Sequence, residues 1–137
     1  MTQVPDSIAI IGAGATGAEF AHIYKSYGAD VTVVEMLDRI IPNEDSEISE
    51  LLSKSFQARG INIRTGVSVS SIELQNGTAV VNILENEAEE IISADKVLVA
   101  VGVQPNTDEI GLENIGVTTE NGFVSVGDHM ATNVKGV

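Results

Sequence analysis

Cysteine is absent from the 137-residue chain, which excludes a disulfide framework, catalysis by a thiolate and a cysteine metal site. The two histidines, His22 and His129, lie far apart in the sequence and belong to no ligand-spaced cluster. We therefore expect no metal site and no catalytic histidine. The absence of cysteine also fits a cytoplasmic protein.

Basic residues are few as well. Seven Lys and Arg stand against 20 Asp and Glu, and the seven form no cluster along the chain. Such an acidic surface repels nucleic acid, so we expect no nucleic-acid partner. No apolar run approaches the roughly 20 residues that a membrane span needs, and no signal peptide is evident, so we expect no membrane partner either.

What the chain does have is enough apolar sequence for a core. Hydrophobic residues make up 43% and charged residues 20%, as is usual for a soluble globular protein. The length suits one domain, and no repeat, low-complexity segment or linker interrupts it. We therefore expect a single domain over residues 1–137.

A glycine-rich turn follows the first predicted strand, Ser7–Ile11, which holds the apolar run Ile8–Ile11. This run is continuously apolar, as expected for a parallel strand that is covered on both faces, and residues 16–27 are expected to form a helix that ends at Gly28. The turn has the spacing G-x-G-x-x-G at Gly12, Gly14 and Gly17. Unpaired N–H groups and the dipole at a helix start form an anion site, so the turn is typical of one that binds a diphosphate.

Each glycine of the turn has its own expected role. Gly12 allows the sharp turn, and Gly14 lets a pyrophosphate approach the backbone where a β-carbon would collide. Gly17 lets the helix pack closely on the strand. These roles are binding and positioning, so we assign no catalytic residue to the chain.

An acidic residue, Glu35, ends the second predicted strand, Asp30–Glu35, close to the roughly 20 positions beyond the last glycine that dinucleotide-binding folds show. Its carboxylate can accept hydrogen bonds from both hydroxyls of an adenosine ribose, and it repels a 2′-phosphate. Met36 and Leu37 follow, with no arginine immediately after the strand to receive a phosphate. We therefore predict NAD(H) rather than NADP(H).

The next part of the chain predicts a second helix and a third parallel strand. The helix is expected to open at Ile41-Pro42-Asn43, with Asn43 as its cap, and to close at Arg59-Gly60. Helical spacing puts four apolar residues on one of its faces, namely Ile48, Leu51, Leu52 and Phe56. Ile61–Arg64 should be the third parallel strand.

An antiparallel insertion is expected after this strand. It comprises Val67–Leu74, Thr78–Leu84 and Glu90–Ile92, with a hairpin at Asn76-Gly77. Asp95–Val101 should rejoin the parallel sheet, and Phe123–Val126 is one more strand in a looser tail. The fold class is thus α/β, a Rossmann-like parallel sheet with flanking helices and an inserted antiparallel β-meander.

Three separated motifs, in the right order, resemble the NAD-binding domain of the dihydrolipoamide dehydrogenase family, pyridine nucleotide-disulfide oxidoreductases. They read IAIIGAGATGAEFA, VTVVEMLDRIIPNEDSEIS and DKVLVAVGVQPNTDEIGLENIGV. The resemblance covers nearly the whole chain. It implies NAD as the cofactor of this domain and FAD in the parent enzyme only, with hydride passing between them during dihydrolipoamide oxidation.

The resemblance also implies a set of cofactor-binding positions. Glu19 lies near the nicotinamide end, Glu35 binds the ribose, Val69 meets the adenine by its backbone, and Gly102 lies beside the cofactor. Thr16 stands where the family usually has an aliphatic residue, and its hydroxyl either touches a phosphate or is merely tolerated. The positions of the glycine turn itself are Gly12, Ala13, Gly14, Ala15, Thr16, Gly17 and Ala18.

Several parts of the family's enzymes are missing from these 137 residues. They are the redox-active cysteine pair, both FAD motifs and the C-terminal dimerisation domain. The resemblance therefore implies one domain of a longer, homodimeric parent enzyme, whose FAD-binding and C-terminal domains are its partners. We expect no dehydrogenase turnover from the isolated fragment.

Two other classes of protein stay open as alternatives. A free-standing NAD-sensing regulatory module, such as those of potassium channels, also pairs a glycine motif with an acidic residue, but it keeps strand–helix alternation throughout. The antiparallel insertion argues against it. A methyltransferase-like fold that binds S-adenosylmethionine finds no second motif here, and the glycine spacing suits a pyrophosphate better.

Overall fold

The computed structural model describes residues 3–137, and the backbone divides into two compact units. The first unit ends at Gly102, and the second runs from Val103 to Val137. The single domain expected over residues 1–137 stays a prediction. Within the described residues, no helix has both the length and the apolar character that crossing a membrane requires.

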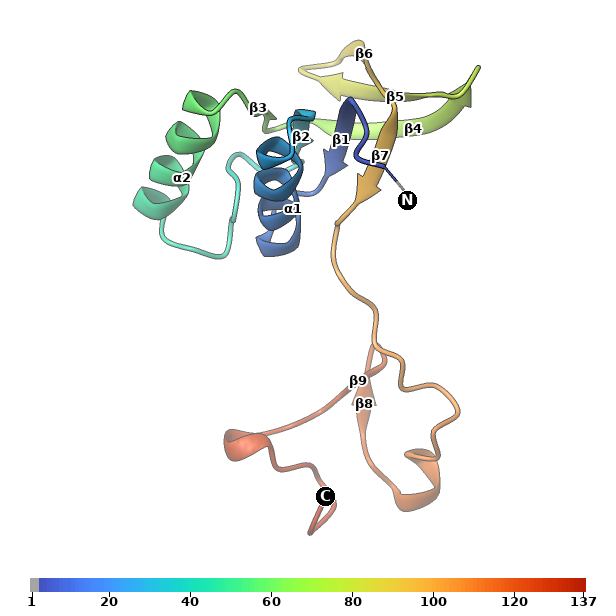
Figure 1. Ribbon diagram of the computed structural model, residues 1–137. Helices are drawn as coiled ribbons and strands as arrows, with labels where there is room; N and C mark the ends of the chain where they lie inside the picture. Colours follow the sequence, from blue (N-terminus) through green and yellow to red (C-terminus); the bar gives the residue numbers. More distant parts are fainter. Residues whose placement is uncertain (1–2) are drawn as a thin grey trace. The chain divides into compact units, whose positions relative to one another are not determined.

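In the first unit, four strands form a parallel sheet in the order β3-β2-β1-β7 (Figure 1). The strands are β1 (Ser7–Ile11), β2 (Asp30–Val34), β3 (Asn62–Arg64) and β7 (Lys96–Val99). Helix α1 (Ala15–Ser26) joins β1 to β2, and helix α2 (Ser46–Ala58) joins β2 to β3. The predicted Rossmann-like arrangement is confirmed.

An antiparallel sheet of three strands, β4 (Ser68–Gln75), β5 (Thr78–Glu85) and β6 (Ala88–Ala94), is inserted between β3 and β7. The predicted hairpin is confirmed, since Asn76 and Gly77 have φ values of 53° and 88°, as a two-residue type I′ turn demands. Strand β6 is longer than predicted because it pairs with β5 from Ala79 to Glu85, which is all of that strand except its first residue.

Strand β1 alternates its side chains between two cores, which explains why Ile8–Ile11 are all apolar. Ile8 and Ile10 belong to a core that includes residues of α1 and α2, here called the helix-side core. Ala9 and Ile11 belong to a second core that includes residues of β5 and β6. The helices therefore cover one face of the parallel sheet and the meander covers the other (Figure 1).

The two helices differ in how well their ends were predicted. Helix α1 ends as expected, because Gly28 follows it with a φ of +94°, a left-handed conformation that glycine tolerates. The predicted start of α2 is wrong: Asn43 does not cap it. The helix begins at Ser46, its N-cap residue is Asp45, and Asn43 lies in a turn before it.

The apolar face expected on α2 is only partly buried. Phe56 is buried and Leu52 partly so, both in the helix-side core, whereas Ile48 is 50% exposed and Leu51 is 63% exposed. Helical spacing places all four residues in one stripe, but only the part of that stripe that reaches the core is covered.

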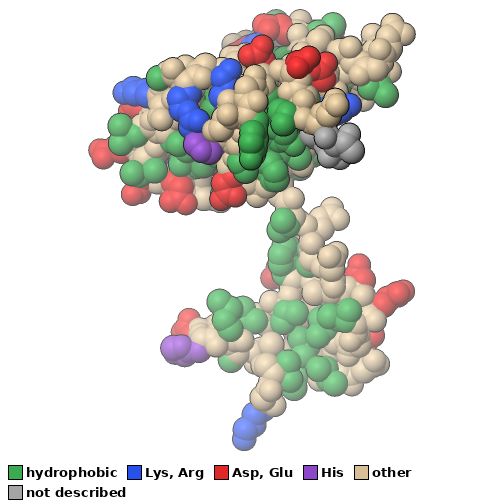
Figure 2. Space-filling model, viewed as in Figure 1, with side chains coloured by type: hydrophobic (Ala, Val, Ile, Leu, Met, Phe, Trp, Pro, Cys, Tyr) green, Lys and Arg blue, Asp and Glu red, His purple; other side chains and the backbone are tan. Residues whose placement is uncertain are grey.

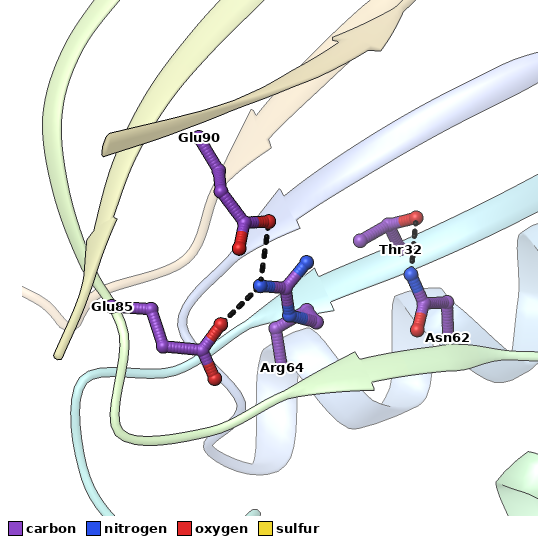
Figure 3. A network of polar contacts seen from close by, with 5 residues as sticks. All are labelled: Thr32, Asn62, Arg64, Glu85 and Glu90. Carbon is purple, nitrogen blue, oxygen red and sulfur yellow. Dashed lines mark hydrogen bonds and ion pairs between the residues drawn. The ribbon is translucent and has the colours of Figure 1, made fainter. Parts of the chain in front are cut away.

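Arg64, the last residue of β3, ties the parallel sheet to the meander (Figure 3). Its guanidinium donates hydrogen bonds to the carboxylates of Glu85 and Glu90, the latter at 3.0 Å. These bonds raise the pKa of Arg64 above its ordinary value. All three side chains remain partly exposed, so the network stabilises the fold only modestly.

The second unit has little regular structure. The predicted strand Phe123–Val126 is present but shorter, and its hairpin partner was not predicted, although Asn121-Gly122 between them repeats the signal seen at Asn76-Gly77. Hydrophobic side chains lie on the visible face of this unit (Figure 2). Its elements are η1 (Glu113–Ile115), β8 (Thr119–Glu120), β9 (Phe123–Val124) and η2 (Asp128–Met130).

Candidate functional site

Three strands of the parallel sheet end at the same edge. Ile11 at the end of β1 is in register with Val34 of β2 and with Val99 of β7. The residues that come next, Gly12, Glu35 and Ala100, therefore begin their turns at the carboxyl edge of the sheet. Ligands of open α/β sheets bind outside this edge.

A cleft of about 560 Å³ opens there, between the glycine turn, the ends of β2 and β7, the loop before α2 and the start of β4. The structure brings together at this cleft seven of the predicted site residues, from segments far apart in the sequence. They are Gly12, Gly14, Ala15, Thr16, Glu35, Val69 and Gly102.

The other four predicted site residues, Ala13, Gly17, Ala18 and Glu19, lie outside the cleft lining. Ala13 and Ala18 are buried in the helix-side core, and the main-chain N–H of each already has an acceptor within the protein. Gly17 is buried, and Glu19 is exposed on α1. The N–H groups of Ala13 and Ala18 are therefore not free to bind a phosphate.

The three glycines of the turn differ in what an added β-carbon would meet. At Gly12 it would lie 2.5 Å from the carbonyl oxygen of Ala100, and at Gly17 it would lie 1.9 Å from that of Gly12. At Gly14 it would meet nothing within 4 Å, and φ there is an ordinary −66°. The fold itself thus requires Gly12 and Gly17, whereas the space beside Gly14 is open.

Helix α1 begins at the cleft without a side-chain cap. Gly14 is the N-cap residue, and the first turn holds no acidic residue. Within the described residues, the N–H groups of Ala15, Thr16 and Gly17 have no hydrogen-bond acceptor. Together with the positive end of the helix dipole, these N–H groups have the chemistry to bind an anion.

Glu35 is the one acidic side chain among the described residues that line the cleft, and it is only 9% exposed. One carboxylate oxygen, Oε2, accepts a hydrogen bond from the N–H of Ala13 at 2.7 Å, and Oε1 accepts one from the N–H of Leu37 at 2.9 Å. Because each carboxylate oxygen has two lone pairs, Glu35 can accept further hydrogen bonds from a ligand.

Most other residues of the cleft lining are apolar, and within the described part of the chain no Lys, Arg or His takes part. Sequence patterns did not single out several of its members. Met36, Leu37 and Val101 follow strands whose ends meet at one edge, and this rule could have found them. Pro42 and Asn43 had no such signal, because they reach the cleft through a loop.

A parallel sheet in this order, a glycine turn leading into its first helix and an acidic residue at the end of its second strand define the Rossmann-like class of α/β proteins. The model of one family, described as pyridine nucleotide-disulphide oxidoreductase, matches residues 1–137. The chain belongs to the pyridine nucleotide-disulphide oxidoreductase family, as its motifs predicted.

Curated relatives of the chain are named dihydrolipoyl dehydrogenase. The relative from Mycobacterium leprae is 45% identical over 134 residues, which cover 97% of this chain and 29% of the relative. The relative from Bacillus subtilis is 39% identical over 134 residues, which cover 96% of this chain and 28% of the relative. The chain therefore spans well under half the length of these relatives.

Solved structures share the fold. LpdA from Mycobacterium tuberculosis matches with a TM-score of 0.85 at 27% identity, covering 98% of this chain and 29% of LpdA. The HOCl-induced flavoprotein disulfide reductase RclA from Escherichia coli matches with a TM-score of 0.83 at 27% identity, covering 98% of this chain and 30% of RclA. The resemblance to dihydrolipoamide dehydrogenases is confirmed at the level of family and fold.

Proposed function

We propose that the chain is the NAD(H)-binding domain of a dihydrolipoyl dehydrogenase-type flavoprotein, and that it positions the nicotinamide for hydride exchange with FAD. The open space at Gly14 carries this proposal. This space borders main-chain N–H groups that have no acceptor, and the buried carboxylate of Glu35 lines the same cleft. The names of the relatives support the reaction class.

The diphosphate of the cofactor is placed at the glycine turn, against the N–H groups of Ala15 and Thr16. Gly14 leaves the room that a β-carbon would take. The free lone pairs of Glu35 accept hydrogen bonds from the adenosine ribose, and its negative charge disfavours the 2′-phosphate of NADP(H). No cation lines the described cleft to offset that repulsion, which favours NAD(H).

Three further residues keep the roles that the family resemblance implies. Glu19 orients the nicotinamide end, Val69 contacts the adenine through its backbone, and Gly102 lies beside the cofactor. When bound, the nicotinamide supplies the hydride chemistry, and the protein binds and orients it.

The rest of the reaction belongs to the proposed parent enzyme, a cytoplasmic homodimer. The chain has no cysteine, so it cannot supply a redox disulfide. We therefore propose that the FAD-binding and C-terminal domains of the parent are partners of this domain. The 137 residues alone should bind NAD(H) and show no turnover with dihydrolipoamide.

Titration of the chain with NADH, ATP and S-adenosylmethionine tests the proposed ligand. We expect NADH to bind most tightly. Preferential binding of S-adenosylmethionine or ATP would overturn the proposal, because either result assigns the cleft to a different class of protein.

Gly14→Val tests the place of the diphosphate. The ordinary φ and the open space at Gly14 predict a protein that still folds, with only a small drop in the unfolding midpoint because valine is a poorer N-cap residue than glycine. The added side chain should reduce NADH affinity by about a hundredfold or more. Unchanged affinity would refute the assigned turn.

Glu35→Ala tests the ribose contact. We expect weaker binding of NADH and a smaller ratio between the affinities for NADH and NADPH. The ratio of the two affinities is the decisive readout, since partial unfolding would weaken the binding of NADH and of NADPH equally. Tighter binding of NADPH by the unaltered protein would contradict the role given to this carboxylate.

A further inference from the structure

The loop between β2 and α2 is fastened to the glycine turn. The N–H of Ile41 donates a hydrogen bond to the carbonyl of Ala13 at 2.7 Å. From the helix side, the hydroxyl of Ser49, a buried residue of α2, donates to the carbonyl of Ile40 at 2.7 Å. The loop is therefore held from both sides, and its shape is set by the protein itself.

This loop carries a strained residue. Ile41 has a φ of +39°, which a β-branched residue rarely adopts. Its carbonyl accepts a hydrogen bond from the N–H of Glu44 at 3.0 Å and so closes a turn around Pro42 and Asn43. Strained backbone of this kind persists only where surrounding contacts hold it, and it gathers at sites that clamp ligands.

Both central residues of the turn, Pro42 and Asn43, line the cleft. The guanidinium of Arg39 donates a hydrogen bond to the carbonyl of Pro42 at 2.9 Å, and this bond holds the turn in addition to the two bonds described above. Asn43 is exposed, and its side-chain amide has no hydrogen-bond partner within the described residues. Two N–H donors are thus presented at the cleft on a preformed turn.

From this geometry we propose that the side-chain amide of Asn43 binds the ligand, donating a hydrogen bond to the diphosphate of the bound dinucleotide. This inference rests on the proposed NAD(H) function. Within the described lining no cation is available, so neutral donors must meet the negative charge of a diphosphate. Asn43 supplies such donors from the loop that is bonded to the glycine turn, where that diphosphate is placed.

A purely structural role is the competing explanation, because asparagine is favoured in turns. Aspartate suits a turn as well, but its carboxylate has no N–H and carries a negative charge. Asn43→Asp should therefore keep the turn and repel the diphosphate. Asn76→Asp is the matched control, since it adds the same charge in the β4–β5 turn, which lies outside the cleft lining.

The experiment compares the dissociation constants of ADP-ribose and adenosine for the unaltered chain and the two variants, by NMR titration. We expect Asn43→Asp to bind ADP-ribose at least about tenfold more weakly, with adenosine unchanged, because only ADP-ribose carries the diphosphate. Asn76→Asp should bind both as the unaltered chain does. Asn43→Ala, which removes the amide without adding charge, should bind ADP-ribose about threefold to fivefold more weakly and should bind adenosine as the unaltered chain does.

Three results would overturn the inference. Equal ADP-ribose affinity in Asn43→Asp, Asn43→Ala and the unaltered chain would show that the amide does not bind it, and the NAD(H) proposal would stand. Equal losses for ADP-ribose and adenosine in both Asn43 variants would assign the residue a structural role. Failure of the unaltered chain to bind ADP-ribose would overturn the NAD(H) proposal itself, and this inference with it.

Discussion

The two units of the chain differ in how much of their structure they stabilise by themselves. The first unit buries two cores, one on each face of its parallel sheet. Across residues 103–137, all of which the structure describes, Val117 is the only buried hydrophobic side chain. Segments of about 35 residues rarely fold on a hydrophobic core alone. The second unit therefore buries too little apolar surface to offset the entropy of its chain, whereas the first unit buries enough.

The candidate site lies entirely in the better-packed unit. Every residue that lines the cleft falls between Ile11 and Gly102. The second unit instead exposes large apolar side chains, among them Val103, Ile110 and Met130. The candidate site and both cores therefore belong to the same unit of the chain.

The largest expected effect comes from glycine substitutions, one in each unit. Gly17→Ala puts a β-carbon 1.9 Å from the carbonyl oxygen of Gly12, so the free energy of unfolding should fall by about 3 kcal/mol or more. Gly127→Ala should change it by less than about 1 kcal/mol, because the nearest atom is 4.0 Å away. Urea unfolding measures both free energies, and equal losses of stability in the two variants would contradict the difference drawn between the two units.

Core truncations give the next effect. Ile10→Ala removes a fully buried side chain from the helix-side core and should reduce the free energy of unfolding by about 2–5 kcal/mol. Val117→Ala should leave hydrogen-exchange protection of the β1 amides within about 0.5 kcal/mol of its original value. A clear loss of β1 protection in Val117→Ala would mean that the second unit supports the first.

A smaller effect is expected at the ion pairs of Arg64. Arg64→Met should reduce the free energy of unfolding by up to about 1 kcal/mol, because its partners Glu85 and Glu90 are partly exposed. The loss should shrink in high salt. Lys54→Met, which breaks an exposed i,i+4 pair with Glu50, is the control and should lower stability less than Arg64→Met does. A salt-independent loss above about 2 kcal/mol would argue against this interpretation.

The smallest effect is expected from removing residues 103–137. The remaining chain should keep its cooperative unfolding, and its NADH dissociation constant should stay within about threefold, since all residues that line the cleft are retained. Calorimetry and urea unfolding check both expectations. Loss of NADH binding with the fold intact would show that the second unit contributes to the site.

The parallel sheet and the glycine turn could be predicted because their signals are local. Ile8–Ile11 is apolar without interruption, and the glycines follow it at a spacing that a strand-to-helix turn requires. The structural demand on Gly12 and Gly17 agrees with that interpretation. The position of Glu35 on the cleft could also be predicted, since strand ends in a parallel sheet share an edge.

The loop before α2 could not be predicted from local signals. Pro42 and Asn43 resemble the opening of a helix, and the later start at Ser46 accompanies the bond from Ile41 to Ala13, a contact across almost thirty residues. Helical spacing likewise could not tell that Ile48 and Leu51 would stay largely exposed while Phe56 is buried. How far a neighbouring core extends along a helix depends on tertiary packing, and the helical spacing of apolar residues does not predict it.

The double hydrogen bonding of Glu35 has a consequence for redesigning cofactor preference. Shortening this side chain to admit a 2′-phosphate also removes the acceptor of the Ala13 N–H, a buried donor, at a cost of about 1–3 kcal/mol. Nucleotide selectivity and the rigidity of the glycine turn therefore both depend on the carboxylate of Glu35, and a substitution there changes both. A variant that exchanges one cofactor for the other needs a compensating second substitution, one that returns an oxygen to that amide.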